Sequence, residues 1–348
     1  MPSAAPIRGS VQVIAHRGAS ALRPEHTLAA YRKAIEDGAD FVEPDLVMTR
    51  DGVLVARHEC ELSRSTDVAA HAEFAQRRAR KTIDGAVMEG WFCEDFSLAE
   101  LRRLRAREPM PELRDIAHDG IHPVPTFDEI VALLAAESQR LGRKVGIIPE
   151  LKNSTHHRSA GLNLEQALLA AISRHECLRR LPFGIQSFEV GNLKELRESI
   201  APQIDNVFLV QLIGDADHAP IDLRKCGGSA CTYADMLTPA GLLQICGYAD
   251  AIAVHRHVLL PLDPHSGGLV ETTTLVAEAH AQGLAVQAWT LRPENRFLPP
   301  AFRCSPDDGR RCETGALREA HALIATGVDA LFFDDPALGR RAVDTWRP

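Results

Sequence analysis

Short apolar runs alternate along the chain with segments in which apolar side chains recur every three or four residues. The apolar runs have the length and β-branched content of strands, and the segments between them have helical spacing. This alternation is typical of βα units whose strands form a parallel sheet. The predicted strands cover residues 11–15, 41–47, 53–57, 145–151, 183–188, 207–213, 251–254, 285–291 and 330–333.

The spacing between the predicted strands separates barrel strands from a hairpin arm. Only residues 48–52 lie between the second and third runs, and Asp51-Gly52 is a tight-turn signal. A parallel crossover needs a dozen or more residues, so the third run is predicted to fold back as a hairpin. Eight strands remain, and they predict a TIM (β/α)8 barrel of the α/β class. The predicted outer helices cover residues 27–37, 126–141, 164–175, 189–199, 239–247, 272–282 and 315–325.

One long segment interrupts this rhythm. Residues 59–125 are charged and mostly not strand-like, with a helical pattern at 98–107. We interpret them as an insertion that lies over the barrel mouth, within a single barrel domain of residues 10–348. The charged run at 76–81 is expected on an exposed face of this insertion.

Composition excludes several classes of protein. The chain has 348 residues, 45% of them hydrophobic, which is enough for a sizeable core. Its net charge of −8 and the lack of a long basic run argue against a nucleic-acid partner. No apolar stretch reaches transmembrane length, and residues 1–10 contain no apolar segment of the signal-peptide type. The sequence as it stands predicts a cytoplasmic protein, with a periplasmic or secreted one as the alternative if it is a processed form.

The eight cysteines leave their redox state open. They lack paired C-x-x-C spacing, which argues against a zinc site. Cys226 with Cys231, and Cys304 with Cys312, lie in loop-like segments where each pair would form a disulfide if the protein is exported. Free thiols are the alternative for both pairs.

Three carboxylates occur where a barrel would bring them together. In TIM barrels the active site forms at the carboxyl ends of the strands. Alternation places Glu43 and Asp45 on one face of the second strand, about 7 Å apart along the backbone. Glu150, on the next barrel strand, adds a third oxygen ligand. Three carboxylates without cysteine favour a hard divalent cation such as Ca²⁺ or Mg²⁺.

Two histidines and two cationic side chains occur at neighbouring strand ends. His16 ends the first strand and His58 follows the hairpin arm, so they are predicted to flank the carboxylates as a general acid and base. Arg17 and Lys152 add fixed positive charge for an anionic oxygen. A divalent cation, two histidines and two cations are what phosphoryl transfer or phosphodiester cleavage requires.

Other polar residues near the strand ends have less definite roles. Gln186 lies in the fourth barrel strand and Trp289 in the seventh, where Trp289 suits barrel packing as well as a substrate wall. We interpret His26, at a helix start, as a capping or packing residue. Pro44 stands between two predicted ligands and has no N–H, so the second strand should show a bulge or a missing hydrogen bond.

The order and spacing of several motifs resemble the glycerophosphodiester phosphodiesterase family over nearly the whole chain. The amino-acid sequence at residues 47–49, 66–68 and 210–213 is most similar to that of the larger bacterial branch, which has periplasmic members. The motifs are His16-Arg17-Gly18-Ala19, Pro24-Glu25-His26-Thr27, Glu43-Pro44-Asp45, His58, Pro149-Glu150-Leu151-Lys152, Gln186-Ser187-Phe188 and Phe333-Asp334-Asp335-Pro336.

The resemblance implies roles for the candidate residues. Glu43, Asp45 and Glu150 would bind one divalent metal, Ca²⁺ rather than Mg²⁺ in the larger branch. His16 and His58 would be the acid–base pair. The implied substrate- and phosphate-binding residues are Arg17, Lys152, Gln186 and Trp289.

The resemblance also implies a reaction and a partner. Small glycerophosphodiesters such as glycerophosphocholine or glycerophosphoethanolamine would be hydrolysed to glycerol 3-phosphate and an alcohol, through a cyclic phosphate. The implied fold is a TIM barrel with a small insertion after His58. A homodimer is the one assembly considered from the sequence, which leaves the oligomeric state open. His58 is followed by Glu59 where the family commonly has Asp, which would alter any hydrogen bond made there.

Two alternatives remain. A lysophospholipase D or sphingomyelinase D-type enzyme shares the histidine and carboxylate layout, but it would favour an apolar rim, whereas the insertion is mostly charged. A non-catalytic barrel would only bind metal or phosphate esters. The presence of both histidines and all three carboxylates argues against that alternative.

Overall fold

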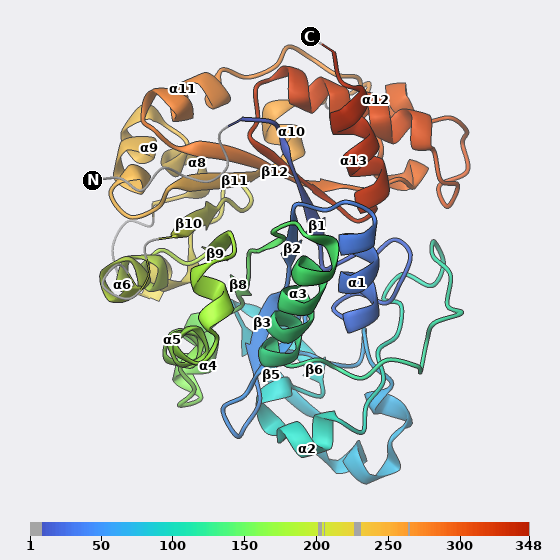
Figure 1. Ribbon diagram of the computed structural model, residues 1–348, viewed down its shortest axis with the longest axis vertical. Helices are drawn as coiled ribbons and strands as arrows, with labels where there is room; N and C mark the ends of the chain where they lie inside the picture. The colour runs from blue at the N-terminus through green and yellow to red at the C-terminus, as the bar shows by residue number, and fades with distance from the viewer. Residues whose placement is uncertain (1–8, 201–203, 205, 226–230, 264, 348) are drawn as a thin grey trace.

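The structure, a computed structural model, describes residues 9–200, 204, 206–225, 231–263 and 265–347. Its main sheet is a closed barrel of parallel strands with helices outside it, so the predicted TIM barrel is confirmed (Figure 1). Pairing of the first strand with the last, and of β9 with β10, completes the ring. In chain order the barrel strands are β1 (Gln12–His16), β2 (Phe41–Glu43) with β3 (Asp45–Met48), β7 (Gly146–Ile147) with β8 (Glu150–Leu151), β9 (Phe183–Ser187), β10 (Val207–Leu212), β11 (Ala251–His255), β12 (Ala285–Leu291) and β13 (Ala330–Phe333).

Two of the eight barrel positions are split, each at a proline. Pro44 separates β2 from β3, as expected for a residue without an N–H. The third barrel strand was predicted to be continuous over 145–151, and this is wrong, because Ile148 and Pro149 divide it into β7 and β8. The segment β4 (Leu54–Ala56) pairs antiparallel with β3, which confirms the predicted hairpin.

The predicted outer helices are present, with small shifts at their ends. The helix expected to start at residue 272 starts at Leu275, and the final helix was not predicted from the sequence. Its start has a recognisable signal, since Pro336 occupies the first turn and the Asp335 carboxylate accepts from Leu338 N. The outer helices are α1 (Leu28–Glu36), α3 (Phe127–Leu141), α5 (Leu164–Arg174), α6 (Gly191–Ile200), α9 (Pro239–Cys246), α11 (Leu275–Ala281), α12 (Glu313–Ala325) and α13 (Pro336–Thr345).

Short helical turns complete the loops at both ends of the barrel. The short α-helices are α4 (Ser154–Ser159), α7 (Ile221–Lys225), α8 (Tyr233–Met236) and α10 (Arg256–Leu259). The 3₁₀ turns outside residues 59–125 are Glu176–Arg179, Asn295–Phe297 and Pro300–Phe302.

Apolar side chains fill both the interior of the barrel and the space between the barrel and its helices. The interior cluster includes Ile14, Phe41, Ile148, Phe208 and Phe332, all nearly inaccessible to solvent. A larger cluster lies between the strands and the surrounding helices. Because the barrel is packed along its length, ligands are restricted to its ends.

Residues 59–125 pack around a second, smaller apolar cluster that they share with Val47 of β3 and Val55 of β4, and the part around β5, β6 and α2 is drawn in cyan in Figure 1. The hairpin of β5 (Ala79–Ile83) and β6 (Ala86–Gly90) was not predicted, and the expected helix at 98–107 is reduced to α2 (Leu98–Leu101). Three 3₁₀ turns, Val68–Ala70, Ala72–Arg77 and Cys93–Asp95, complete this segment.

All seven cysteines that lie in the described residues are free thiols. The Cys304–Cys312 disulfide considered from the sequence is therefore not formed. Cys226 of the other considered pair lies outside the described residues. Within the described part of the chain, none of the helices has both the length and the apolar character needed to cross a membrane.

Candidate active site

A pocket opens at the carboxyl ends of the barrel strands, where the sequence predicted the site. Strand ends from all around the barrel contribute to it, because parallel strands present their carboxyl ends at the same rim. Of the candidate residues, all but Lys152 line this pocket, namely His16, Arg17, Glu43, Asp45, His58, Glu150, Gln186 and Trp289. Lys152 lines an adjoining pocket that shares Glu150 and Trp289 with the first.

The three predicted carboxylates lie together at the bottom of this region. Glu43, Asp45 and Glu150 each place a carboxylate oxygen within 4.8 Å of the others, and all three are buried. Burial and the neighbouring carboxylates raise the pKa of Glu43 well above its ordinary value. Burial and Asp45 likewise raise the pKa of Glu150 to about 8, against the opposing charge of Lys152. For Asp45, in contrast, burial is outweighed by Lys152 and His26, which hold its pKa well below its ordinary value. The raised pKa values of the two buried glutamates show that a bound cation would stabilise their charged forms.

Hydrogen bonds and an ion pair orient these carboxylates, but one carboxylate oxygen, Asp45 Oδ1, has no partner among the described residues. Glu43 accepts from the backbone N–H of Arg17 and from Gln186 Nε2, each at 2.9 Å. Glu150 Oε1 lies 3.0 Å from Lys152 Nζ. The Asp45 Oδ1 atom is also buried. An oxygen-only donor set with an orphaned acceptor fits a hard divalent cation.

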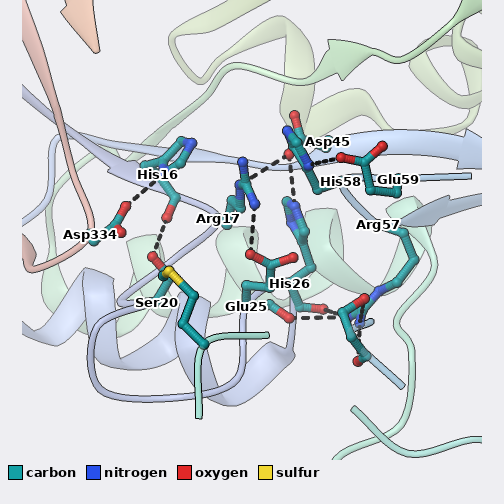
Figure 2. Close-up of polar contacts among 12 residues, drawn as sticks. His16, Arg17, Ser20, Glu25, His26, Asp45, Arg57, His58, Glu59 and Asp334 are labelled. Atoms are coloured by element: carbon teal, nitrogen blue, oxygen red, sulfur yellow. Dashed lines mark hydrogen bonds and ion pairs between the residues drawn. The ribbon is translucent and has the colours of Figure 1, made fainter. Parts of the chain in front are cut away.

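His16 is held from the far end of the chain. Its Nδ1 lies 2.6 Å from Asp334 Oδ1, at the end of β13, and Figure 2 shows this contact on one side of the site. Arg114 Nη2 and Arg292 Nε also contact Asp334, at 2.6 and 2.9 Å. Burial opposes ionisation of Asp334, but these guanidinium groups and His16 hold its pKa well below its ordinary value. Burial and the charge of Arg17 lower the pKa of His16 to about 4, against the opposing charge of Asp334 and its hydrogen bond to the ring.

His58 is held locally and more openly. Its Nδ1 lies 2.8 Å from Glu59 Oε1, and the two side chains are 31% and 37% exposed. The pair lies on the other side of Asp45 from His16 (Figure 2). Burial of the ring edge and the charges of Arg17 and Lys152 lower the pKa of His58 well below its ordinary value. A neutral imidazole oriented by a carboxylate is suited to accept a proton.

Arg17 lies between the two histidines and is fixed by carboxylates (Figure 2). Its Nη1 donates to Glu25 Oε2 at 2.7 Å, and its Nε lies 3.4 Å from Asp45 Oδ2. Arg17 has a φ of 60° and Gly18 a φ of 86°, so the chain turns sharply after β1. A Cβ on Gly18 would come within 2.7 Å of the Ala30 backbone, which explains the glycine.

His26 is part of the site's support, and of the two roles expected for it, packing is confirmed and helix capping is wrong. The cap of α1 is Thr27, whose side chain accepts from Ala30 N. The His26 ring is fully buried, with Nδ1 2.8 Å from the Tyr31 hydroxyl and Nε2 2.9 Å from Asp45 Oδ2. His26 therefore orients a predicted metal ligand from the side opposite the pocket.

Gln186 and Trp289 both lie in the pocket wall. The Gln186 amide donates to Glu43, and its Oε1 is buried without a partner among the described residues. Trp289 donates from Nε1 to the Ala253 carbonyl at 3.2 Å, and its ring packs edge-on against His255 and Phe188. Gln186 thus contacts a carboxylate directly, whereas Trp289 forms an aromatic wall.

Several site residues were not singled out from the sequence. Asp334, Arg292 and His255 end or follow barrel strands, so the strand-end rule that found His16 would also have found them. Arg57 ends the predicted hairpin arm, so it had a strand-end signal as well: it is fully buried and its guanidinium donates to the carbonyls of Glu25 and His26. These bonds fix the loop that holds Arg17 and Asp45, as Figure 2 shows.

Comparison with known proteins gives one consistent family. The sequence profile of the Glycerophosphoryl diester phosphodiesterase family matches residues 16–338. A curated relative, the glycerophosphodiester phosphodiesterase GDPD6 of Arabidopsis thaliana, is 34% identical, over 92% of this chain and 82% of its own length. A glycerophosphodiester phosphodiesterase of Haemophilus influenzae is 27% identical, over 94% of this chain and 88% of its own.

Solved structures with the same fold cover almost the whole chain. A putative glycerophosphoryl diester phosphodiesterase of Silicibacter pomeroyi superimposes with a TM-score of 0.65 at 21% identity, over 98% of this chain and 96% of its own. A phosphodiesterase of Oleispira antarctica was solved in complex with the product sn-glycerol-3-phosphate. It superimposes with a TM-score of 0.61 at 21% identity, over 97% of this chain and 98% of its own. At this identity the structures establish the fold.

Proposed function

Because the chain belongs to the glycerophosphoryl diester phosphodiesterase family, and is by that membership an enzyme that hydrolyses glycerophosphodiesters, we propose a specific reaction for its pocket. The proposed reaction is the metal-dependent hydrolysis of glycerophosphocholine and glycerophosphoethanolamine to glycerol 3-phosphate and the free alcohol, with His16 and His58 as the acid–base pair. The observation that supports it most is the placement of two carboxylate-oriented histidines on either side of a buried three-carboxylate cluster.

Glu43, Asp45 and Glu150 are the proposed metal ligands. Their donor set contains only oxygen atoms, which favours Ca²⁺ or Mg²⁺, and Ca²⁺ is proposed because its coordination geometry is the less strict of the two. A bound cation supplies positive charge that polarises the phosphodiester and stabilises the charge developing on its oxygens.

Arg17 and Lys152 are the proposed phosphate-binding cations. Each is already paired with a ligand carboxylate, so each lies at the edge of the cluster where the phosphate oxygens must approach. Gln186 is proposed to position Glu43, and Trp289 to form a wall of the substrate pocket.

The histidines are proposed to move the protons of a two-step reaction. In the first step one histidine removes the proton of a glycerol hydroxyl, whose oxygen attacks phosphorus, while the other protonates the departing alcohol oxygen. This forms a cyclic glycerol phosphate and releases the alcohol. In the second step the roles reverse: water loses a proton to one histidine, attacks the cyclic ester, and the reopened hydroxyl regains a proton.

Residues 59–125 are proposed to be an insertion that covers part of the mouth within one barrel domain. Supporting this, Arg114 of the insertion is buried against Asp334 and Glu294, which follow barrel strands. His58 lines the active-site pocket, and together with Glu59 it also lines a second pocket to which Met110 and Leu113 of the insertion contribute. The insertion would therefore limit which headgroups reach the carboxylates.

A headgroup panel with metal add-back tests the proposal. After treatment with EDTA, hydrolysis of glycerophosphocholine, glycerophosphoethanolamine and lysophosphatidylcholine is measured with Ca²⁺ or Mg²⁺ restored. Glycerol 3-phosphate is expected from the two glycerophosphodiesters, more rapidly with Ca²⁺. Preferred cleavage of lysophosphatidylcholine would instead establish a lipid phosphodiesterase, and activity that survives EDTA would contradict metal dependence.

Histidine variants test the acid–base assignment. His16→Ala and His58→Ala are each expected to reduce kcat by about 10²–10⁴-fold with the fold retained. His280→Ala is the matched control, because His280 also pairs with an aspartate, Asp329, at 2.8 Å but lies outside the pocket. Near-normal turnover in either active-site variant would overturn the assignment.

A further inference from the structure

A second cluster of metal-ligand side chains lies outside the active-site pocket, where residues 59–125 meet α4. The Cys60 thiol, the Glu94 carboxylate and the His156 ring each place a potential ligand atom within 4.8 Å of the others. Cys60 and Glu94 are buried, and the His156 side chain is only 12% exposed. Because these ligands come from distant parts of the chain, the cysteine spacing could not reveal them.

A neighbouring histidine, His157, lies next to the thiol, although it does not belong to the group of three whose ligand atoms are all within 4.8 Å of one another. His157 Nε2 lies 3.5 Å from Cys60 Sγ. In a tetrahedral zinc site with bonds of about 2.3 Å to sulfur and 2.0–2.1 Å to nitrogen, sulfur and nitrogen ligands lie about 3.5 Å apart. His157 and Cys60 therefore already have the separation that a shared metal ion requires.

The donors of this cluster are incompletely satisfied. Glu94 Oε1 accepts from Lys81 at 2.8 Å and lies 2.7 Å from His156 Nε2. The Glu94 side chain is only 3% exposed, and its Oε2 atom is buried without a hydrogen-bond partner among the described residues. His157 Nδ1 is also buried without a partner in the described chain. Unpaired buried polar atoms are costly, and a bound ion would give Glu94 Oε2 a partner, whereas His157 Nδ1 would stay unpaired because Nε2 is the atom that faces the thiol.

The charges around the cluster balance when a dication is added. Binding would release one proton from the Cys60 thiol, and the thiolate and the Glu94 carboxylate together neutralise a doubly charged ion. Lys81 does not lose its only partner if Glu94 turns to the metal, because Lys81 Nζ also lies 2.7 Å from Asp95 Oδ2. The buried site would then carry no net charge, which burial favours.

We propose that Cys60, Glu94, His156 and His157 form a binding site for a borderline divalent cation of the zinc class. One sulfur, imidazole nitrogens and one carboxylate suit Zn²⁺, whereas the oxygen-only cluster in the pocket suits Ca²⁺ or Mg²⁺. The two sites therefore select different metals.

The position of the site indicates a structural role. Cys60 follows His58 by two residues, and α4 begins two residues after Lys152. A metal held there would join the start of the insertion to the segment after β8. It would thereby restrict the motion of His58 relative to Glu150 without contacting the substrate.

Cobalt binding provides the test, since thiolate-bound Co²⁺ has a characteristic near-ultraviolet absorption. Metal-free full-length protein is saturated with Ca²⁺ and titrated with Co²⁺, then with Zn²⁺. One equivalent of Co²⁺ is expected to give the thiolate band, and Zn²⁺ to abolish it. Glu43→Gln is expected to keep the band, so failure of the proposed active-site chemistry would not affect this result.

Variants identify the ligands. Cys60→Ala is expected to abolish the thiolate band, and His156→Gln to weaken Co²⁺ binding at least about tenfold. His175→Gln is the matched control, because His175 Nε2 also lies 2.7 Å from a carboxylate, Asp128, but among the described residues it belongs to no group of three potential metal ligands. Cys304→Ala tests one of the two exposed thiols in the described residues, Cys246 and Cys304, as a competing site.

The outcomes are separable even if one variant folds poorly. Zn²⁺ is expected to raise the urea midpoint of the wild-type chain and of His175→Gln, but not that of His156→Gln, whose side chain is near the surface. Retention of the band in Cys60→Ala, its loss in Cys304→Ala, or Co²⁺ binding to the wild-type chain without any thiolate band would overturn the proposal.

Discussion

From β9 through β13 to β1 the barrel consists of single strands, whereas the second and third barrel positions are each divided at a proline. The continuous part contributes the His16–Asp334 pair, and the divided part contributes Glu43, Asp45 and Glu150. Uninterrupted ladders fix a pair of opposite charges at neighbouring strand ends. A divided strand can direct several carboxylates toward one point, and a bound cation must then neutralise their negative charges.

The two parts therefore differ in how fully nearby positive charges compensate their buried carboxylates. Asp334 is matched by Arg114, Arg292 and His16, so it is stable as it stands. Glu43 faces Asp45 and Glu150 at short range, and the protein alone does not fully compensate them. Substitutions in the two parts should consequently have opposite effects on stability in the absence of metal.

Glu43→Gln should give the largest effect on activity and little cost in stability. Removing one ligand is expected to reduce kcat/KM by about 10³-fold. In EDTA the free energy of unfolding should be unchanged or higher, because one like charge is gone, and Ca²⁺ should stabilise the variant less than the wild type. Urea unfolding with and without Ca²⁺ measures both; a strongly destabilised metal-free variant would contradict the comparison.

Asp334→Asn should be damaging in both respects. Loss of the carboxylate is expected to reduce kcat by about 10²-fold, because His16 loses its orienting partner. It should also lower the free energy of unfolding by about 3 kcal/mol, because Arg114 loses a buried counter-charge. Asp344→Asn, which breaks an exposed pair with Arg340, is the control and should cost less than about 0.5 kcal/mol.

His255, at the end of β11, should make the continuous part sensitive to acid. Burial and the charge of Arg256 lower the pKa of His255 to about 3. The folded state then binds fewer protons than the unfolded state, so stability is complete above the unfolded pKa near 6.5 and falls as pH decreases toward 3.

Substitution of His255 gives that expectation a measurement. Between pH 7 and pH 5 the wild type should lose about 2 kcal/mol more than His255→Asn, as measured by urea unfolding. Asparagine keeps an acceptor for the His257 N–H, which His255 Nδ1 now receives at 3.3 Å. Parallel pH profiles of the two proteins would show that His255 does not titrate differently on folding.

Pro44→Ala should have the smallest effect. The strand is divided there mainly because proline lacks an N–H, and alanine adds freedom to the unfolded chain, so a loss of about 1 kcal/mol is expected. Calcium affinity should fall less than tenfold, since Arg17 and Gln186 still hold Glu43. A much larger loss of calcium affinity, measured by calorimetry, would mean that the proline itself determines the orientation of the carboxylates.

Local sequence predicted the features that depend on one element at a time. The alternation of strand and helix patterns predicted the barrel, and the tight turn at Asp51-Gly52 predicted the β3–β4 hairpin. Polar residues ending apolar runs predicted Glu43 and His16, because parallel strands bring their carboxyl ends to one rim. In residues 59–125 the same approach failed, since short strands and 3₁₀ turns have weak periodicity.

The sequence by itself determined the barrel, the rim where polar strand ends meet and the residue types available there. Only the tertiary structure decided which of these side chains touch. His16 meets Asp334 across 318 positions of sequence, and Cys60 meets His157 across 97. Hydrophobic periodicity reports which face of an element is buried, but a contact between distant elements depends on how the whole barrel closes.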